Sequence, residues 1–335
     1  MIKLGNLSAS LRFWLMSLLQ LGPGIGDVFY LVVNSSAYHV WLVNQKIPGD
    51  HIFHTLAAAY AATTENRNDV ILAFPGAYVQ TAELPWTKAH THLVGLGGPN
   101  IGGDYSEPNV VFYTITANVA SVITVTGAYC QFHNFVVENN CDDADNLTAA
   151  TINIYGTHWK KVAFHGNMQD TQCATAVCAS LYIGAAGMYP LFEDCIIGQD
   201  VWSARAAANS GVLRFSGTGG RPNGGIFRRC QFLSVGTTAT CAMVAIPAGT
   251  SSGRGWLFDN CSFQHFDSGA TTETLARAFY SISAAVQKHS MLLRRCSAFG
   301  IDEWQTDDDS VVLADMPITG LGGGLARNPT GTVGQ

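Results

Sequence analysis

A short pattern of apolar and polar positions recurs along the middle of the chain. Each copy has an apolar residue, two polar residues, an apolar or cysteine anchor, one further residue and a second apolar residue. The six anchors are Phe135, Val162, Cys195, Cys230, Cys261 and Cys296. Successive anchors are 27, 33, 35, 31 and 35 residues apart. The last copy, Leu293–Phe299, fits the pattern only if one extra residue precedes its phenylalanine. Such near-constant spacing is typical of a repeat architecture.

The composition of the repeated segments predicts strands and not helices. The segments are short, aromatic or β-branched, and most are followed closely by Gly, Asn or Ser, as expected for strands bounded by turns. Further strands are expected between the anchors, at Ser121–Thr126, Ala149–Tyr155, Ala179–Ile183, Gly211–Phe215 and Cys241–Ile246. Each repeat would then carry two or three short strands. We therefore predict an all-β fold, a right-handed single-stranded parallel β-helix, in which Cys195, Cys230, Cys261 and Cys296 stack in an internal column.

The two polar residues before each anchor change sign from one repeat to the next. They are Lys160-Lys161, Glu193-Asp194, Arg228-Arg229, Asp259-Asn260 and Arg294-Arg295. Successive coils of a β-helix lie about 4.8 Å apart, so these pairs would be stacked neighbours on the outside. The pattern predicts a surface ladder of ion pairs, each worth about 0–1 kcal/mol, and not an active site.

The ends of the chain differ from its middle. Residues 54–62 have helical composition, and a helix there would cover the open end of the first coil. We expect an N-terminal arm over residues 1–25, the β-helix over 26–304, and an extended C-terminal arm over 305–335. The apolar stretch 11–21 is too short to span a membrane. It is either the core of a signal peptide or a packing arm, and the sequence leaves both open.

Composition narrows the class of partner. Hydrophobic residues make up 47% and charged residues 13% of the 335 residues, and the formal net charge is −6. This acidic balance argues against general binding to nucleic acid or to anionic membranes. The nine cysteines lack the spacing of a zinc site. We therefore interpret most of them as small core residues and expect no disulfide framework.

Candidate chemistry is sparse. Asp142, Asp143 and Asp145 form an acidic loop, which solvation explains and which alternatively offers oxygen ligands to calcium or contacts to a glycan. The acidic pair at 193–194 and the run of three aspartates at 307–309 have the same plain explanation. His90 and His92 lack a third ligand, and Arg221 is at most a contact residue. We predict no catalytic residues, no metal site and no cofactor.

Two motifs carry a resemblance to known proteins. The helical segment followed by Asp69-Val-Ile-Leu-Ala-Phe-Pro-Gly-Ala-Tyr78, together with the repeated coils, resembles the pectate-lyase-like superfamily of right-handed β-helices over residues 50–300. The segment Gly26-Asp-Val-Phe-Tyr-Leu-Val-Val-Asn-Ser-Ser36 resembles β-helix structural proteins of tailed bacteriophages. The resemblance is specific for fold and weakly specific for function.

This resemblance implies a function that the residues alone do not. It implies a non-enzymatic virion structural protein, a capsid decoration or head-fibre component on the surface of the particle. Its terminal arms would attach it to partners such as the major capsid protein, and it would be a homotrimer. The alternative is a polysaccharide-degrading lyase or depolymerase, or a module that binds a host surface glycan. That alternative needs a groove, which Trp202, Trp256 and Trp304 could line.

Overall fold

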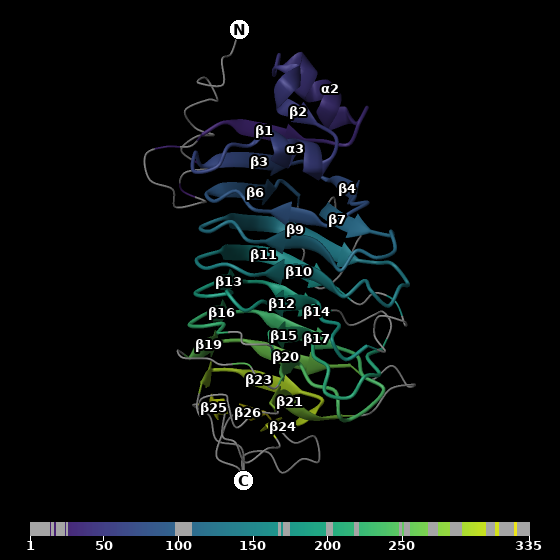
Figure 1. The fold of residues 1–335 in the computed structure, drawn as a ribbon, viewed down its shortest axis with the longest axis vertical. Coiled ribbons are helices and arrows are strands. Elements are labelled where there is room, and N and C mark those ends of the chain that lie inside the picture. The colour runs from purple at the N-terminus through teal and green to yellow at the C-terminus, as the bar shows by residue number, and fades with distance from the viewer. Residues whose placement is uncertain are drawn as a thin grey trace.

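The protein is described by a computed structural model. It describes residues 14, 17, 24, 26–97, 109–166, 169, 175–198, 204–217, 221–247, 250, 255–266, 274–281, 290–305, 312–314 and 325–326. Within these residues the strands wind around one long axis, and each strand pairs in parallel with the equivalent strand of the next coil (Figure 1). The predicted right-handed parallel β-helix is confirmed.

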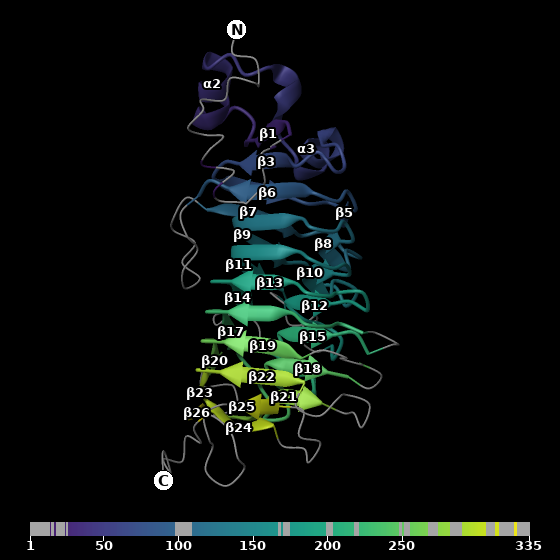
Figure 2. The same cartoon turned by 90° about the vertical axis from the view of Figure 1, so that its left-hand side faces the viewer.

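The described strands form two parallel sheets that run the length of the β-helix (Figure 2). The larger sheet contains β1 (Val28–Leu31), β2 (Ile52–Phe53), β3 (Asp69–Ala73), β4 (Gly76–Val79), β6 (Thr91–Gly95), β7 (Val110–Thr114), β9 (Gln131–Asn139), β11 (His158–His165), β13 (Leu191–Glu193), β14 (Ile196–Gly198), β16 (Ile226–Arg228), β17 (Gln231–Ser234), β19 (Trp256–Asp259), β20 (Ser262–His265), β22 (Met291–Arg294), β23 (Ser297–Phe299), β25 (Val312–Ala314) and β26 (Leu325–Ala326). The smaller sheet contains β5 (Leu84–Trp86), β8 (Ser121–Val125), β10 (Thr148–Ile152), β12 (Leu181–Ile183), β15 (Leu213–Phe215), β18 (Val244–Ile246), β21 (Leu275–Ser281) and β24 (Ile301–Gln305).

A bend in the larger sheet falls on the second polar residue of every repeat. That residue has a positive φ in all six copies, at Asn134, Lys161, Asp194, Arg229, Asn260 and Arg295, with values from 53° to 61°. The left-handed conformation turns the chain between the two halves of the sheet, for example between β13 and β14. The polar pair therefore marks a corner of the coil, and the sequence pattern locates that corner correctly.

The first apolar position of the repeat forms an aromatic stack in the core. Its members are Phe132, Trp159, Phe192, Phe227 and Phe258, all buried and each paired with the next through the sheet register. The rings of Phe192 and Phe227 are nearly parallel, with centroids 4.4 Å apart, and those of Phe227 and Phe258 are 5.0 Å apart. Every coil thus presents the same flat face to its neighbours.

The last repeat needs a correction. Ala298, and not Phe299, pairs with Phe263 of the preceding coil. Phe299 is 70% exposed. No extra residue is inserted, because the small alanine occupies the core position and the phenylalanine takes the next, outward position of the strand.

The four anchor cysteines are buried beside this stack. Their thiols lie near carbonyl oxygens of the preceding coil, with Sγ to O distances of 3.5 Å for Cys195 to Trp159, 3.6 Å for Cys230 to Phe192, 3.4 Å for Cys261 to Phe227 and 3.3 Å for Cys296 to Phe258. The eight described cysteines are free thiols, and Cys173 lies outside the described residues.

The helices α2 and α3 lie at the N-terminal end of the described β-helix (Figure 1). The expected helix is α3 (Leu56–Ala62), whose first turn is capped by the Thr55 side chain and whose Leu56 and Ala59 join the main core. A second helix, α2 (Ala37–Asn44), was not predicted. Its Leu42 packs outside the larger sheet on Val28 and Val70. A one-turn 3₁₀ helix, η2 (Gly49–His51), follows α2.

The expected arms fall largely outside the described residues, including most of the stretch 11–21 and of the segment 305–335. Within the described part of that last segment, β25 and β26 pair with β22 and β23. Among the described helices none is long and apolar enough to cross a membrane.

Candidate functional site

The outer face of the smaller sheet carries a column of polar side chains, one from each of four successive coils. The strand register aligns Thr124 with Thr151, Thr151 with Tyr182, and Tyr182 with Arg214. The residues on either side of these positions, such as Leu181 and Ile183, are fully buried in the core. Since side chains alternate along a strand, the polar residues must face outward.

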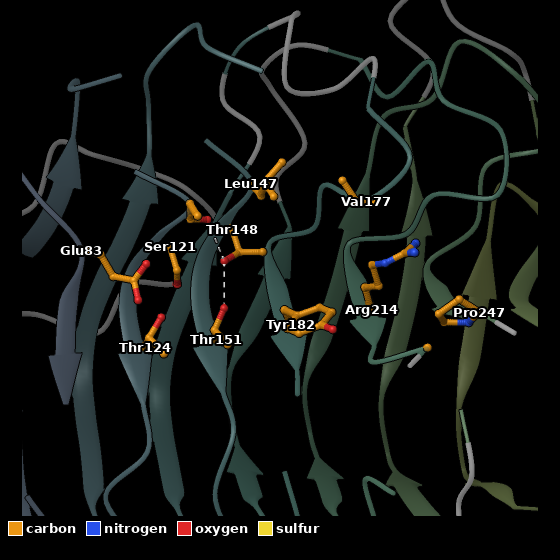
Figure 3. Close-up of a pocket in the computed structure, with 12 residues that line it drawn as sticks. Glu83, Ser121, Thr124, Leu147, Thr148, Thr151, Val177, Tyr182, Arg214 and Pro247 are labelled. Atoms are coloured by element: carbon orange, nitrogen blue, oxygen red, sulfur yellow. Dashed lines mark hydrogen bonds between the residues drawn. The ribbon is translucent and has the colours of Figure 1, made fainter. Parts of the chain in front are cut away.

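This column forms the floor of a groove of about 610 Å³. The groove crosses the smaller sheet from Glu83 beside β5 to Pro247 beyond β18 (Figure 3). Its remaining lining comes from Ala120, Ser121, Leu147, Thr148, Val177 and Gly217. A groove across several coils suits a ligand that is long, narrow and repetitive.

Hydroxyl groups line the middle of the groove. Thr148 and Thr151 lie within hydrogen-bond distance, with 3.2 Å between their Oγ1 atoms, and Ser121 Oγ donates to the Ile123 carbonyl at 3.0 Å. Each hydroxyl keeps a free lone pair for an external donor. With the Tyr182 ring beside them, these groups make a surface of the kind that binds sugars, which present both hydroxyls and apolar ring faces.

Arg214 is the cation of the groove. It is partly buried, and its Nη1 donates to the Ala176 carbonyl at 2.9 Å. Burial lowers the pKa of its guanidinium, and the charge of Arg205 acts in the same direction while Tyr182 opposes it. The group nevertheless stays charged at working pH. No carboxylate among the described residues forms an ion pair with it, so its charge has lost part of its hydration without gaining an opposite charge.

The groove lacks a pair of carboxylates. Glu83 is the only acidic residue among the described residues that line it. Glu83 lies four strands from Arg214, about 19 Å away at the usual strand spacing. Glycoside hydrolysis by the common mechanism needs two carboxyl groups about 5–9.5 Å apart. The lining residues therefore do not fit that reaction.

The predicted acidic loop lies elsewhere. Asp142, Asp143 and Asp145 follow β9, on the larger sheet, and the Asp145 amide donates to the Asp143 carboxylate at 2.9 Å. Asp142 and Asp145 are exposed. Within the described residues no group of three His, Cys, Asp or Glu side chains is placed to hold a metal ion. The possible contact of this loop with a cation or a glycan stays a prediction.

The predicted ladder of ion pairs is present on the larger sheet. Arg228 bonds Glu193 at 3.0 Å and Arg229 bonds Asp194 at 2.6 Å. Asp259 is held by Arg294 at 2.7 Å and by Arg295 at 2.9 Å. The hydrogen bond from Arg294 is the main reason that the pKa of Asp259 is lowered to about 2. These charged residues pair with one another and do not line the groove.

Two of the tryptophans named for a groove, Trp256 and Trp304, do not line this one. Trp256 is fully buried and its Nε1 donates to the Pro222 carbonyl at 3.0 Å, while Trp304 is 4% exposed. Trp202 and the acidic run 307–309 lie outside the described residues. His92 is buried and lies 3.3 Å from Asn68, and Arg221 is exposed away from the groove.

Sequence analysis missed Tyr182 and Arg214. Both lie in strands that were predicted, at Ala179–Ile183 and Gly211–Phe215. The available signal was the alternation itself, since each is the single polar residue between two apolar ones in its strand. Aligning the second strands of successive coils, as was done for the cysteine anchors, would have brought them together.

Comparison with known proteins identifies structures with the same fold but assigns the chain to no family. The sequence matches no protein family, and no curated protein is significantly similar to it. Among solved structures, the chain shares its fold with pectin methylesterases. A pectin methylesterase mutant in complex with a hexasaccharide is 15% identical, with a TM-score of 0.51 over 82% of this chain and 80% of that one. The enzyme from Yersinia enterocolitica is 15% identical, with a TM-score of 0.50 over 78% and 95%.

These comparisons correct the functional expectation. A non-enzymatic virion structural protein was placed first, yet the structures with this fold are carbohydrate-active enzymes and give no support to a phage protein. That prediction was wrong, and the preference for a protein without enzymatic activity is not supported. The alternative, a protein that processes or binds a polysaccharide, is better supported. The expected homotrimer and location stay untested predictions.

Proposed function

We propose that the protein binds a carboxylated polysaccharide along the groove of the smaller sheet and cleaves it. The observation that carries this proposal is Arg214, a partly buried cation without a carboxylate partner among the described residues. Apart from Glu83 at the far end, the other described residues of the groove offer hydroxyl and apolar groups. A carboxylate on the ligand would supply the missing charge in a bidentate geometry.

The form of the groove supports a polymer as the ligand. Thr124, Thr151, Tyr182 and Arg214 repeat at one position per coil, about 4.8 Å apart. A polysaccharide chain lying along the axis would meet one side chain of this column per coil. The similar fold of a pectin methylesterase that holds a hexasaccharide agrees with a carbohydrate ligand. At 15% identity that likeness extends to fold only.

The residues at the end of the column fit a lyase reaction. Arg214 would bind the carboxylate of a uronic acid and stabilise the negative charge that develops when the neighbouring carbon loses its proton. The Tyr182 side chain lies one coil away, and its phenolate oxygen would accept that proton. The C–H electrons form the new C=C bond, the glycosidic C–O bond breaks, and the leaving oxygen takes the proton that Tyr182 has accepted, which restores the phenolate. The products are an unsaturated uronate and a new chain end.

Binding without cleavage is the second candidate. It is favoured by one observation, the absence of paired carboxylates among the described lining residues. The two candidates share the ligand and differ only in turnover.

The test uses purified protein and a carboxylated polysaccharide such as polygalacturonate or alginate. A matched sample has its carboxyl groups reduced to alcohols. We expect binding in affinity electrophoresis of the carboxylated polymer only, and ultraviolet absorbance from unsaturated products. Arg214→Ala should weaken binding at least tenfold, whereas the exposed control Arg221→Ala should not. Equal binding of the reduced polymer would overturn the proposal. Binding without unsaturated products would leave the glycan-binding candidate.

A further inference from the structure

A second pocket lies on the larger sheet, at the bend of the coils. It has a volume of about 360 Å³. Its lining comes from β6, β9 and β11 and from the N-terminal segment, through Trp14, Val94, Gly95, Gly97, His133, Asn134, Lys160 and Lys161. It shares no lining residue with the groove of the smaller sheet.

The bend itself builds the base of the pocket. Asn134 and Lys161 occupy the left-handed corner of two successive coils, with φ of 61° and 54°. The Asn134 amide donates to the carbonyls of Gly95 at 3.0 Å and of Gly97 at 2.8 Å, which ties the corner to the coil below. The side chains of Lys160 and Lys161 project from a backbone segment that the sheet holds on both sides.

The two lysines are the exception in the ladder of ion pairs. The nearest acidic pair is one coil above, at Glu193 and Asp194. Glu193 is bonded to His158 and to Arg228, both at 3.0 Å, and Asp194 is bonded by Arg229 through two nitrogens. The pKa of Glu193 is raised by burial and lowered by the bonds from His158 and Arg228 and, less, by the charge of Lys160. Both lysines also lower the pKa of Asp194, each less than Arg229 does. Among the described residues no carboxylate pairs with either lysine.

A buried imidazole without a full set of partners adds a second, independent observation. His133 is 2% exposed and lines the pocket. Its Nε2 lies 3.3 Å from Gln131 Oε1, whereas its Nδ1 has no hydrogen-bond partner among the described residues. Burial lowers the pKa of this imidazole to about 3, so the ring is neutral at working pH. A buried nitrogen without a partner is costly unless a ligand or water completes it.

We infer that this pocket binds an acidic sugar, with its carboxylate or sulfate group on Lys160 and Lys161. Two ammonium groups suit an oxyanion with more than one acceptor oxygen. The His133 imidazole can bond a sugar hydroxyl, and the half-exposed Trp14 indole offers a flat apolar wall for the ring. The site would make the protein a binder of acidic glycans at a second position, independent of the groove and of any cleavage there.

The experiment measures binding by isothermal titration calorimetry with three disaccharides of one backbone: carboxylated, sulfated and neutral. The protein background is Arg214→Ala, which removes the cation of the groove. We expect the carboxylated or the sulfated sugar to bind and the neutral one to fail. Lys160→Ala with Lys161→Ala should weaken binding at least tenfold, and raising salt should weaken it further.

The control variant is Lys46→Ala, an exposed lysine near α2 whose loss should leave binding unchanged. Thermal unfolding of the double lysine variant separates loss of binding from loss of folding. Unchanged binding by that folded variant would overturn the inference. So would binding of the neutral sugar with equal affinity. If inorganic sulfate binds as tightly as the sulfated sugar, the saccharide part of the inference is wrong.

Discussion

Two columns of polar side chains run along the outside of this β-helix, and they differ in whether their charged residues have partners of opposite charge. On the larger sheet, the acidic residues Glu193, Asp194 and Asp259 are all bonded by arginines of the next coil. On the smaller sheet, Arg214 stands in a row with Thr124, Thr151 and Tyr182 and pairs with no described carboxylate. Both columns repeat once per coil, so periodicity alone does not separate structure from function.

The difference lies in whether the charges satisfy one another. A charge that has a partner within the fold contributes to stability, and removing the partner leaves a costly unpaired group. A charge that is partly buried without a partner costs stability, and such a residue is a candidate for ligand binding. Lys160 and Lys161 lie in the column of the larger sheet but, like Arg214, have no carboxylate partner among the described residues.

The largest effect is expected from a substitution in the core, which supports both columns. Phe227 stacks between Phe192 and Phe258 in the core, and Phe227→Ala would leave a cavity there. We expect a loss of about 4 kcal/mol in the free energy of unfolding, with the groove and the ladder weakened together. Urea denaturation measures it. Phe299→Ala, at an exposed position, is the matched control and should cost less than about 0.5 kcal/mol.

A smaller effect is expected from breaking the ladder. Asp259 accepts hydrogen bonds from Arg294 and Arg295, and its side chain is 6% exposed. Asp259→Asn should cost about 2 kcal/mol, since charge-assisted bonds are lost and two arginines are left facing each other. The exposed Asp142→Asn is the control. An equal, negligible change in both variants in urea denaturation would show that the ladder does not stabilise the fold.

The same residue predicts a dependence on pH. The pKa of Asp259 is held at about 2, below the ordinary value of about 3.9. Its stabilising contribution is therefore complete above about pH 4 and is lost as the pH falls toward 2. Thermal unfolding between these values should show a steeper loss for the unchanged protein than for Asp259→Asn. Identical slopes would contradict this assignment.

The contrast also explains what the sequence could predict. The repeat around the cysteine anchors located the coils and the bend, because the left-handed corner and the stacked core impose the same residue types in each coil. The outward position of the smaller sheet imposes no such constraint, since threonine, tyrosine and arginine all fit there. Tyr182 and Arg214 therefore carry no repeated signal. The helix α2 was missed because it packs outside the coils and so does not follow the repeat that locates them.

The virion function was inferred from short motifs of the opening segment, around Gly26–Ser36. In the structure that segment holds β1 and the turn before α2. Its apolar residues Val28, Tyr30 and Val32 belong to the buried cluster that includes Leu42 of α2, so packing at the N-terminal end accounts for its composition. Because packing explains the residues of this motif, the motif does not indicate a partner. For this reason the fold was predicted well and the function poorly.

The smallest expected effect on stability tests the comparison most directly. Arg214→Met keeps an unbranched apolar stem and removes the guanidinium group with its charge. Because Arg214 has no carboxylate partner among the described residues, we expect the free energy of unfolding to stay within about 0.5 kcal/mol of the original or to rise. Affinity for a carboxylated polysaccharide should fall at least tenfold in the same variant. Urea denaturation and affinity electrophoresis measure the two quantities. A loss of 2 kcal/mol, as expected for Asp259→Asn, would place Arg214 with the structural charges of the ladder, and the distinction between the columns would fail.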